Sequence, residues 1–85
     1  MPNVRYTKHA VEKFEILKRH GFEVTREQVV KTVSEPDKLI PETSNRYIAQ
    51  KRISKSHVLR VVYRHEGKHK VIITFYPGRK ERYED

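Results

Sequence analysis

The sequence contains no cysteine and no tryptophan, and it has only three glycines. The absence of cysteine excludes disulfide bonds and thiolate metal sites. No apolar run approaches the roughly 20 residues that a membrane-spanning helix needs. The amino terminus also lacks the apolar region of a secretory signal peptide. We therefore expect a cytoplasmic protein.

Apolar residues are scarce too, at 35% of the 85 residues, which limits the chain to a thin core and to one small domain, expected over residues 1–85. Acidic residues are outnumbered, with 11 Asp and Glu against 19 Lys and Arg, for a formal net charge of +8. This excess favours a polyanion such as RNA or DNA as a partner, or an acidic protein. A charged surface without such a partner is the alternative, because such surfaces are common in heat-adapted proteins.

Two helices are predicted in the first half of the chain. Thr7 is a typical N-cap, apolar residues recur at helical spacing along residues 8–20, and Gly21 provides a C-terminal stop. Thr25 is the expected N-cap of the second helix, which a stripe of valines supports and Pro36 ends.

Four strands are predicted around these helices: a short one at 3–6 and an antiparallel series at 46–53, 57–64 and 69–77. Residues 37–45 are expected to form a loop. The order is β-α-α-β-β-β, which predicts an α+β fold with two helices packed on one face of a small antiparallel sheet.

Alternation divides each strand between two faces. In the last strand, Val71, Ile73 and Phe75 are expected to face the helices, and Ile72, Thr74 and Tyr76 the other side. Across the three antiparallel strands, this open face is predicted to collect basic, amide, hydroxyl and aromatic side chains: Arg46, Gln50, Arg52, Arg60, Arg64, Thr74 and Tyr76.

Such a face suits a nucleic-acid backbone, because arginine binds phosphate bidentately and tyrosine stacks on unpaired bases. Pro77-Gly78 is expected to end the last strand and to turn Arg79 and Lys80 toward the same face. The alternative is an ordinary solvated sheet face.

RNA cleavage by its own 2′-hydroxyl needs a base, cations at the phosphate and an acid for the 5′-oxygen. Tyr76 is a candidate acid, Thr74 a candidate donor to phosphate, and a histidine is the simplest proton carrier. His9 lies in the first helical turn, where helix phase places it opposite Phe14 and outside the core. It lies either at the sheet edge or in solvent, and the phase favours solvent. No phosphate-binding glycine loop or carboxylate pair is present, so we expect no cofactor and no metal.

Several motifs together resemble the RelE/BrnT-like toxin superfamily. These are the segment HAVEKFEILKRHGFEVTREQVVKTVSEPD, the hairpin VLRVVYRHEGKHKVIITFYP and the basic tail GRKERYE. The nearest pattern is an uncharacterised group bordering the BrnT-type toxins, with an early His-Ala and a late Ile-Thr-hydrophobic-Tyr-Pro. Here these are His9-Ala10 and the run from Ile73 to Pro77. The chain departs from BrnT in lacking an acidic, Trp-containing amino-terminal segment and a carboxyl-terminal helix.

The resemblance implies a compact ribonuclease-like fold and messenger RNA cleavage without metal, with RNA on the ribosome and an acidic antitoxin protein as possible partners. The catalytic residues that it implies are His9, Thr74, Tyr76 and Arg46. The nucleic-acid-binding residues expected beside them are Arg52, Arg60, Arg64, Arg79 and Lys80.

Two hypotheses follow, a toxin-like metal-independent endoribonuclease and a non-catalytic module of the same fold that binds nucleic acid or an antitoxin. The position of His9 distinguishes them. A His9 within hydrogen-bond reach of Thr74, Tyr76 or a sheet arginine favours catalysis, and a His9 pointing into solvent favours binding alone.

Overall fold

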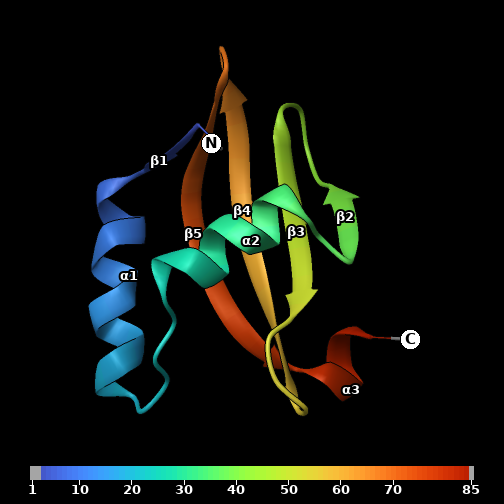
Figure 1. Ribbon diagram of the computed structural model, residues 1–85. Coiled ribbons are helices and arrows are strands. Elements are labelled where there is room, and N and C mark those ends of the chain that lie inside the picture. The colour runs from blue at the N-terminus through green and yellow to red at the C-terminus, as the bar shows by residue number, and fades with distance from the viewer. Residues whose placement is uncertain (1–2, 85) are drawn as a thin grey trace.

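The computed structural model describes residues 3–84. Two helices, α1 (Lys8–Arg19) and α2 (Arg26–Ser34), pack on one face of a five-stranded sheet (Figure 1). The remaining elements are β1 (Val4–Tyr6), β2 (Lys38–Pro41), β3 (Arg46–Arg52), β4 (His57–Glu66), β5 (His69–Arg79) and α3 (Lys80–Tyr83). The predicted α+β class, with both long helices on one face of the sheet, is confirmed.

The strand order in the sheet is β1-β5-β4-β3-β2. The predicted antiparallel series is present as β3, β4 and β5, while β1 pairs with β5 in parallel. The prediction of a loop over residues 37–45 was wrong, because β2 forms there and pairs antiparallel with β3. Pro41 is the last residue of this edge strand, a position where a missing backbone donor is tolerated.

Both helices begin as the capping residues predict. The Thr7 side chain accepts a hydrogen bond from the Ala10 amide at 3.1 Å. Thr25 and Gln28 form a reciprocal capping box, with bonds of 3.0 and 3.1 Å between each side chain and the other residue's amide. Gly21 follows α1 with a φ of 80°, a conformation that glycine adopts without strain.

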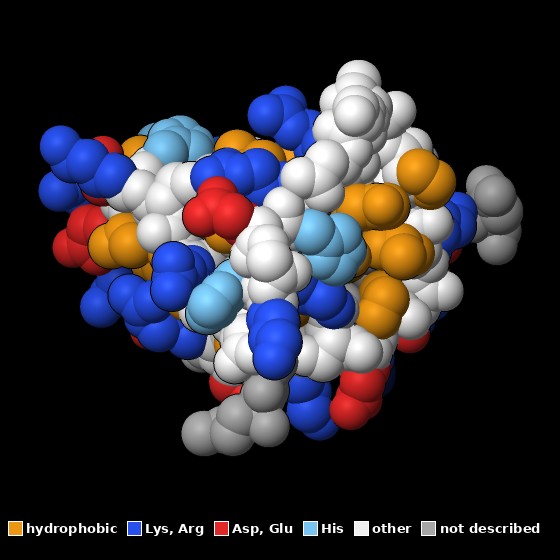
Figure 2. Space-filling view, turned by 90° about the horizontal axis from the view of Figure 1, so that it is seen from above, with side chains coloured by type: hydrophobic (Ala, Val, Ile, Leu, Met, Phe, Trp, Pro, Cys, Tyr) orange, Lys and Arg blue, Asp and Glu red, His pale blue; other side chains and the backbone are white. Residues whose placement is uncertain are grey.

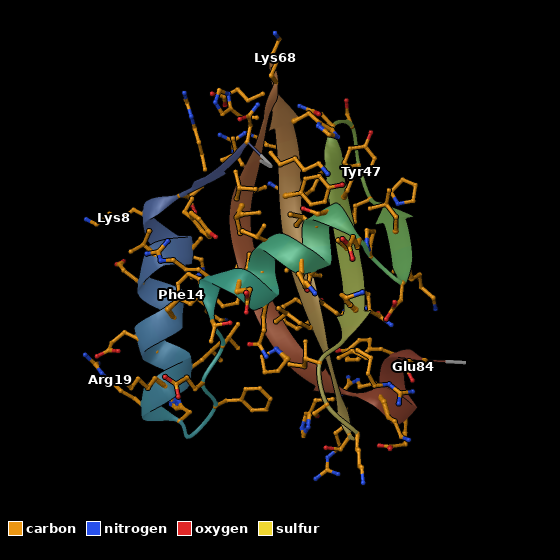
Figure 3. The ribbon with its side chains drawn as sticks, in the orientation of Figure 1. Lys8, Phe14, Arg19, Tyr47, Lys68 and Glu84 are labelled. Atoms are coloured by element: carbon orange, nitrogen blue, oxygen red, sulfur yellow. The ribbon has the colours of Figure 1, made fainter. Side chains whose placement is uncertain are left out.

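The core lies between the sheet and the two helices. Its largest fully buried side chains include Phe75, Leu59 and Ile72 from the sheet and Val29 from α2. Phe14 points from α1 toward the sheet in Figure 3, and its ring centroid lies 4.6 Å from that of Phe75. This tilted ring contact fixes α1 beside β5.

A β-bulge changes the predicted faces of β5. Val62 pairs with Thr74 but the next residue, Tyr63, pairs with Ile72, so Ile73 is the extra residue. Ile72 is therefore fully buried in the core with Phe75, whereas Ile73 is only half-buried. Strict alternation, which placed Val71 and Ile73 on the helix side and Ile72 on the open face, was wrong at these three positions, because Val71 pairs with Arg64 on the open face.

The carboxyl-terminal end of β5 also differs from expectation. The strand continues through Pro77 and Gly78 to Arg79, and a one-turn helix, α3, follows. The Pro-Gly break and the absence of a carboxyl-terminal helix were therefore wrong predictions. Because Arg79 alternates with Gly78 and pairs with His57, it lies on the helix side of the sheet rather than on the open face.

Candidate functional site

His9 lies at the edge of the sheet, with its Nε2 3.2 Å from the Thr74 Oγ1. Of the two positions left open by the sequence, the sheet edge is the one observed, and the preference for solvent was wrong. Helix phase gives only the direction around the helix axis. It does not show that α1 lies beside β5, so that a residue outside the core still meets the part of β5 that β1 leaves unpaired.

Thr7 explains why His9 reaches Thr74. The Thr7 amide donates to the Ile72 carbonyl and its hydroxyl donates to the Ile73 carbonyl, both at 3.0 Å. The start of α1 is thereby fixed to the bulge of β5, one residue before Thr74. Since β1 ends where Tyr6 pairs with Ile72, it leaves the following part of β5 uncovered, and His9 occupies that edge.

A second group of hydrogen bonds crosses the open face and begins at Tyr76. Tyr76 lies two residues after Thr74, on the same side of β5. The Tyr76 hydroxyl accepts from Arg60 Nε at 3.1 Å, and Arg60 Nη1 donates to Gln50 Oε1 at 2.8 Å. The register places these side chains in one row, with Gln50 opposite Arg60 and Arg60 opposite Tyr76. The predicted grouping of these residues on one face is therefore observed.

The structure does not bring Arg46 to this row. Arg46 pairs with Arg64, four residues along β3 from Gln50. Strand geometry separates it from Tyr76 by about 13 Å along the strand and about 10 Å across two strand spacings. Arg60 occupies the position beside Tyr76 instead.

Acidic partners neutralise two of the predicted phosphate-binding arginines. Arg64 donates to Glu66 at 3.2 Å. Arg52 holds the Glu84 carboxylate with two nitrogens: Nε contacts Oε2 at 2.9 Å, and Nη2 contacts Oε1. Alternation indicates the face of each arginine but gives no information about these ion pairs.

The segment after β5 supplies two residues that the sequence analysis missed, Tyr83 and Glu84. The Tyr83 ring lies over Arg60, with the guanidinium carbon 4.3 Å from the ring centroid. It also covers Gly78, where a Cβ would come within 2.2 Å of the ring. Gly78 was the one signal in the sequence that could have indicated this contact. A glycine inside a strand often marks a place where another group approaches the backbone closely.

A hollow of about 510 Å³ separates this segment from the edge of the sheet formed by β2 and β3. It is lined by Asp37, Lys38, Gln50, Arg52 and Glu84. Gln50 Nε2 donates to the Tyr83 carbonyl at 3.1 Å, and Lys38 Nζ approaches the same oxygen at 3.5 Å. Figure 3 shows Glu84 at the lower end of the sheet, away from the β4–β5 hairpin.

The Arg52 guanidinium, which hydrogen-bonds Glu84, holds the pKa of that carboxyl below its ordinary value. A lowered folded-state pKa means that the pair contributes stability above the ordinary glutamate range, about pH 4.3, and loses it as the pH falls through the folded-state value. We expect the NMR signals of residues 80–84 to shift in this acid range as the segment loosens. The Glu84→Gln variant should lack the transition, and a variant that retains it would contradict this assignment.

The opposite end of the sheet carries a separate aromatic group. Tyr47 and Tyr63 stack at 5.6 Å, and the His65 ring meets both edge-on. Burial raises the pKa of Tyr63, which keeps this phenol neutral. Figure 2 looks down on this end of the molecule and shows histidine side chains beside hydrophobic ones, with Lys and Arg distributed around them.

Within residues 3–84 the structure contains no group of three or more His, Asp or Glu side chains placed to hold a metal ion. Over the same residues, no helix is long and apolar enough to cross a membrane.

The two long helices on one face of the five-stranded sheet form a BrnT-like fold, as the sequence motifs predicted. A solved structure with this fold is the 1.1 Å crystal structure of the ribonuclease toxin BrnT from Brucella abortus. The TM-score is 0.56 with 13% sequence identity, over 92% of this chain and 97% of that chain. No family model matches the sequence, and no curated protein matches it.

Proposed function

We propose that the protein is a toxin-like, metal-independent endoribonuclease that cleaves RNA through attack of a 2′-hydroxyl on the adjacent phosphate. The contact between His9 and Thr74 carries this proposal, because it brings a proton carrier to the edge of a basic, aromatic face. The ribonuclease toxin of the same fold supports RNA as the substrate.

His9 serves as the base for the 2′-hydroxyl. When Nε2 is unprotonated, the Thr74 hydroxyl donates to it, and an incoming 2′-hydroxyl takes over that donor role and passes its proton to the ring. Thr74 is then released to donate to a phosphate oxygen. Because His9 is exposed, the RNA backbone reaches this position without any opening of the protein.

Tyr76 serves as the acid for the departing 5′-oxygen. The Tyr76 oxygen accepts a hydrogen bond from Arg60. The Tyr76 hydroxyl proton is therefore not used in that bond and can be donated to the 5′-oxygen. The Arg60 guanidinium lies beside the phosphate that is being cleaved and stabilises the charge that develops there. The products are a 2′,3′-cyclic phosphate and a 5′-hydroxyl. After cleavage, His9 holds an extra proton and Tyr76 lacks one, and water transfers the proton from His9 to Tyr76.

The other predicted contacts serve binding. Arg46 and Arg64 lie together at one end of the open face and are assigned to the RNA backbone rather than to the reacting phosphate. Lys80 starts α3 at the other end, and Arg79, on the helix side, is assigned to RNA that passes around the sheet edge. RNA presented on the ribosome and an acidic antitoxin protein are the proposed partners.

A pair of matched oligonucleotides tests the proposal. We expect the protein to cleave a fluorescent single-stranded RNA in the presence of a chelator. We also expect a 2′-deoxy substitution at the nucleotide before the cut to abolish that cleavage without weakening binding. Cleavage that survives the deoxy substitution would rule out attack by the 2′-hydroxyl. Salt-dependent binding with no cleavage, with or without ribosomes, would instead identify a non-catalytic binding module.

A further inference from the structure

We propose that the Glu84 carboxylate occupies the position of an RNA phosphate on Arg52, and that residues 80–84 leave the open face when RNA binds. This inference rests on the proposed function, because it concerns how the same face receives RNA. Residues 80–84 would act as an internal competitor for one half of the binding surface.

The first observation is the geometry of the Arg52–Glu84 pair. Two guanidinium nitrogens of Arg52 contact the two oxygens of one carboxylate. This planar fork matches a carboxylate and a phosphate equally well, and a phosphodiester carries the same single negative charge. A phosphate can therefore replace Glu84 without rearranging Arg52.

The second observation is the position of the segment relative to the catalytic row. Tyr83 covers the guanidinium of Arg60, whose Nε contacts the Tyr76 hydroxyl. A backbone that extends from His9 past Tyr76 meets Tyr83 next and Arg52 beyond it. With residues 80–84 docked, the open face binds RNA only at its His9 end.

The surroundings of Arg52 favour an anion. Lys38 lines the same hollow as Arg52, and Lys80 contributes to the lowered pKa of Glu84. The other acid in the hollow, Asp37, accepts a hydrogen bond from the Arg52 amide at 2.8 Å and lies 3.6 Å from the Lys51 ammonium. Its charge still acts on Arg52 and Glu84, but it is a smaller influence on the pKa of Glu84 than Arg52 and Lys80 are.

The third observation is that the segment is weakly held. All four residues of α3 are at least partly exposed, and a single helical turn is not stable by itself. The ion pair is exposed on both sides, with 46% and 27% of the Arg52 and Glu84 side chains accessible, and exposed pairs contribute little. Apart from this ion pair, residues 80–84 are held on the sheet by the Tyr83 ring and by a few hydrogen bonds to backbone atoms.

A binding experiment with two charge-matched variants tests this inference. Glu84→Gln removes the competitor, and Glu15→Gln, on the exposed side of α1, changes the net charge equally. Affinity for a fluorescent 2′-fluoro RNA, which cannot be cleaved by 2′-attack, is measured by anisotropy over a range of salt concentrations. We expect Glu84→Gln to bind about five- to tenfold more tightly than Glu15→Gln. Their salt slopes should be similar, because Arg52 contacts a phosphate in the RNA complex of both variants and the slope reports the number of such contacts.

Hydrogen exchange provides the second measurement. The Lys80 amide donates to the Ser56 carbonyl and the Glu84 amide to the Lys80 carbonyl, at 2.9 and 2.7 Å. We expect both amides to lose protection when the wild-type protein binds RNA. Equal affinities for the two variants, with both amides still protected, would overturn this inference and leave RNA binding intact. A failure of all three proteins to bind RNA would overturn the proposed function as well.

Discussion

Replacing His9 with alanine is expected to lower the rate of RNA cleavage by about 10²- to 10⁴-fold, the usual contribution of a positioned proton carrier. His9 is exposed and its ring meets only Thr74 among the contacts described for residues 3–84, so its removal should leave the fold intact. RNA binding should change little, because the arginines of the open face remain. Single-turnover cleavage and anisotropy measure the two effects separately.

His20 provides the matched control. It is the exposed C-cap residue of the same helix, so His20→Ala removes a second imidazole from α1 without touching the sheet edge. We expect this variant to cleave RNA at the wild-type rate. If His9→Ala also retains that rate, His9 is not the base, and the proton must be removed by another group.

Replacing Phe75 with alanine is expected to lower the free energy of unfolding by about 3–5 kcal/mol. Phe75 is fully buried, and it contacts the Phe14 ring that fixes α1 beside β5. Natural domains of this size have a total stability of about 4–13 kcal/mol, so this single change removes a large part of it. Urea unfolding followed by circular dichroism measures the loss.

Two further variants keep this prediction testable if Phe75→Ala does not fold. Phe75→Leu retains most of the volume and should cost less than half as much. Phe22→Ala removes a partly exposed ring that meets His57 edge-on at 5.0 Å, and it should cost only about 1 kcal/mol. Equal losses for the Phe75→Ala and Phe22→Ala variants would show that Phe75 does not hold the core together.

Local signals explain why much of the fold could be predicted. Thr7 and Thr25 are followed by amides and side chains that complete their caps within three residues, so the neighbouring sequence contains the whole interaction. Strands β3 and β4 alternate along their whole lengths and β5 alternates from Thr74 onward, which also defines their faces. The shared face of Gln50, Arg60 and Tyr76 follows directly from that alternation.

The remaining features depend on contacts between distant parts of the chain. The bulge at Ile73 is stabilised by Thr7, 66 positions away, and no pattern within β5 indicates it. β2 gains its structure from pairing with β3, while its own sequence contains a proline and a lysine. Residues 80–84 are ordered by Gly78, Arg60 and Arg52, which are recognisable as their partners only once the sheet is formed.

The candidate site divides in the same way. His9, Thr74 and Tyr76 could be selected because the early His-Ala and late Ile-Thr-x-Tyr-Pro motifs mark them in the sequence. The replacement of Arg46 by Arg60 beside Tyr76 could not, because it depends on the register between β3, β4 and β5. The ion pair between Arg52 and Glu84 could not be predicted either, because it depends on where α3 packs against the sheet.

The identity of the product ends is the most direct test of RNA cleavage by 2′-hydroxyl attack at His9. Mass spectrometry of a defined single-stranded RNA, incubated with the wild-type protein in a chelator, distinguishes the possible ends. We predict 2′,3′-cyclic phosphate and 5′-hydroxyl ends, formed by the wild-type and His20→Ala proteins and nearly absent with His9→Ala. Products with 5′-phosphate ends, or intact RNA with the wild-type protein, would contradict the proposed reaction.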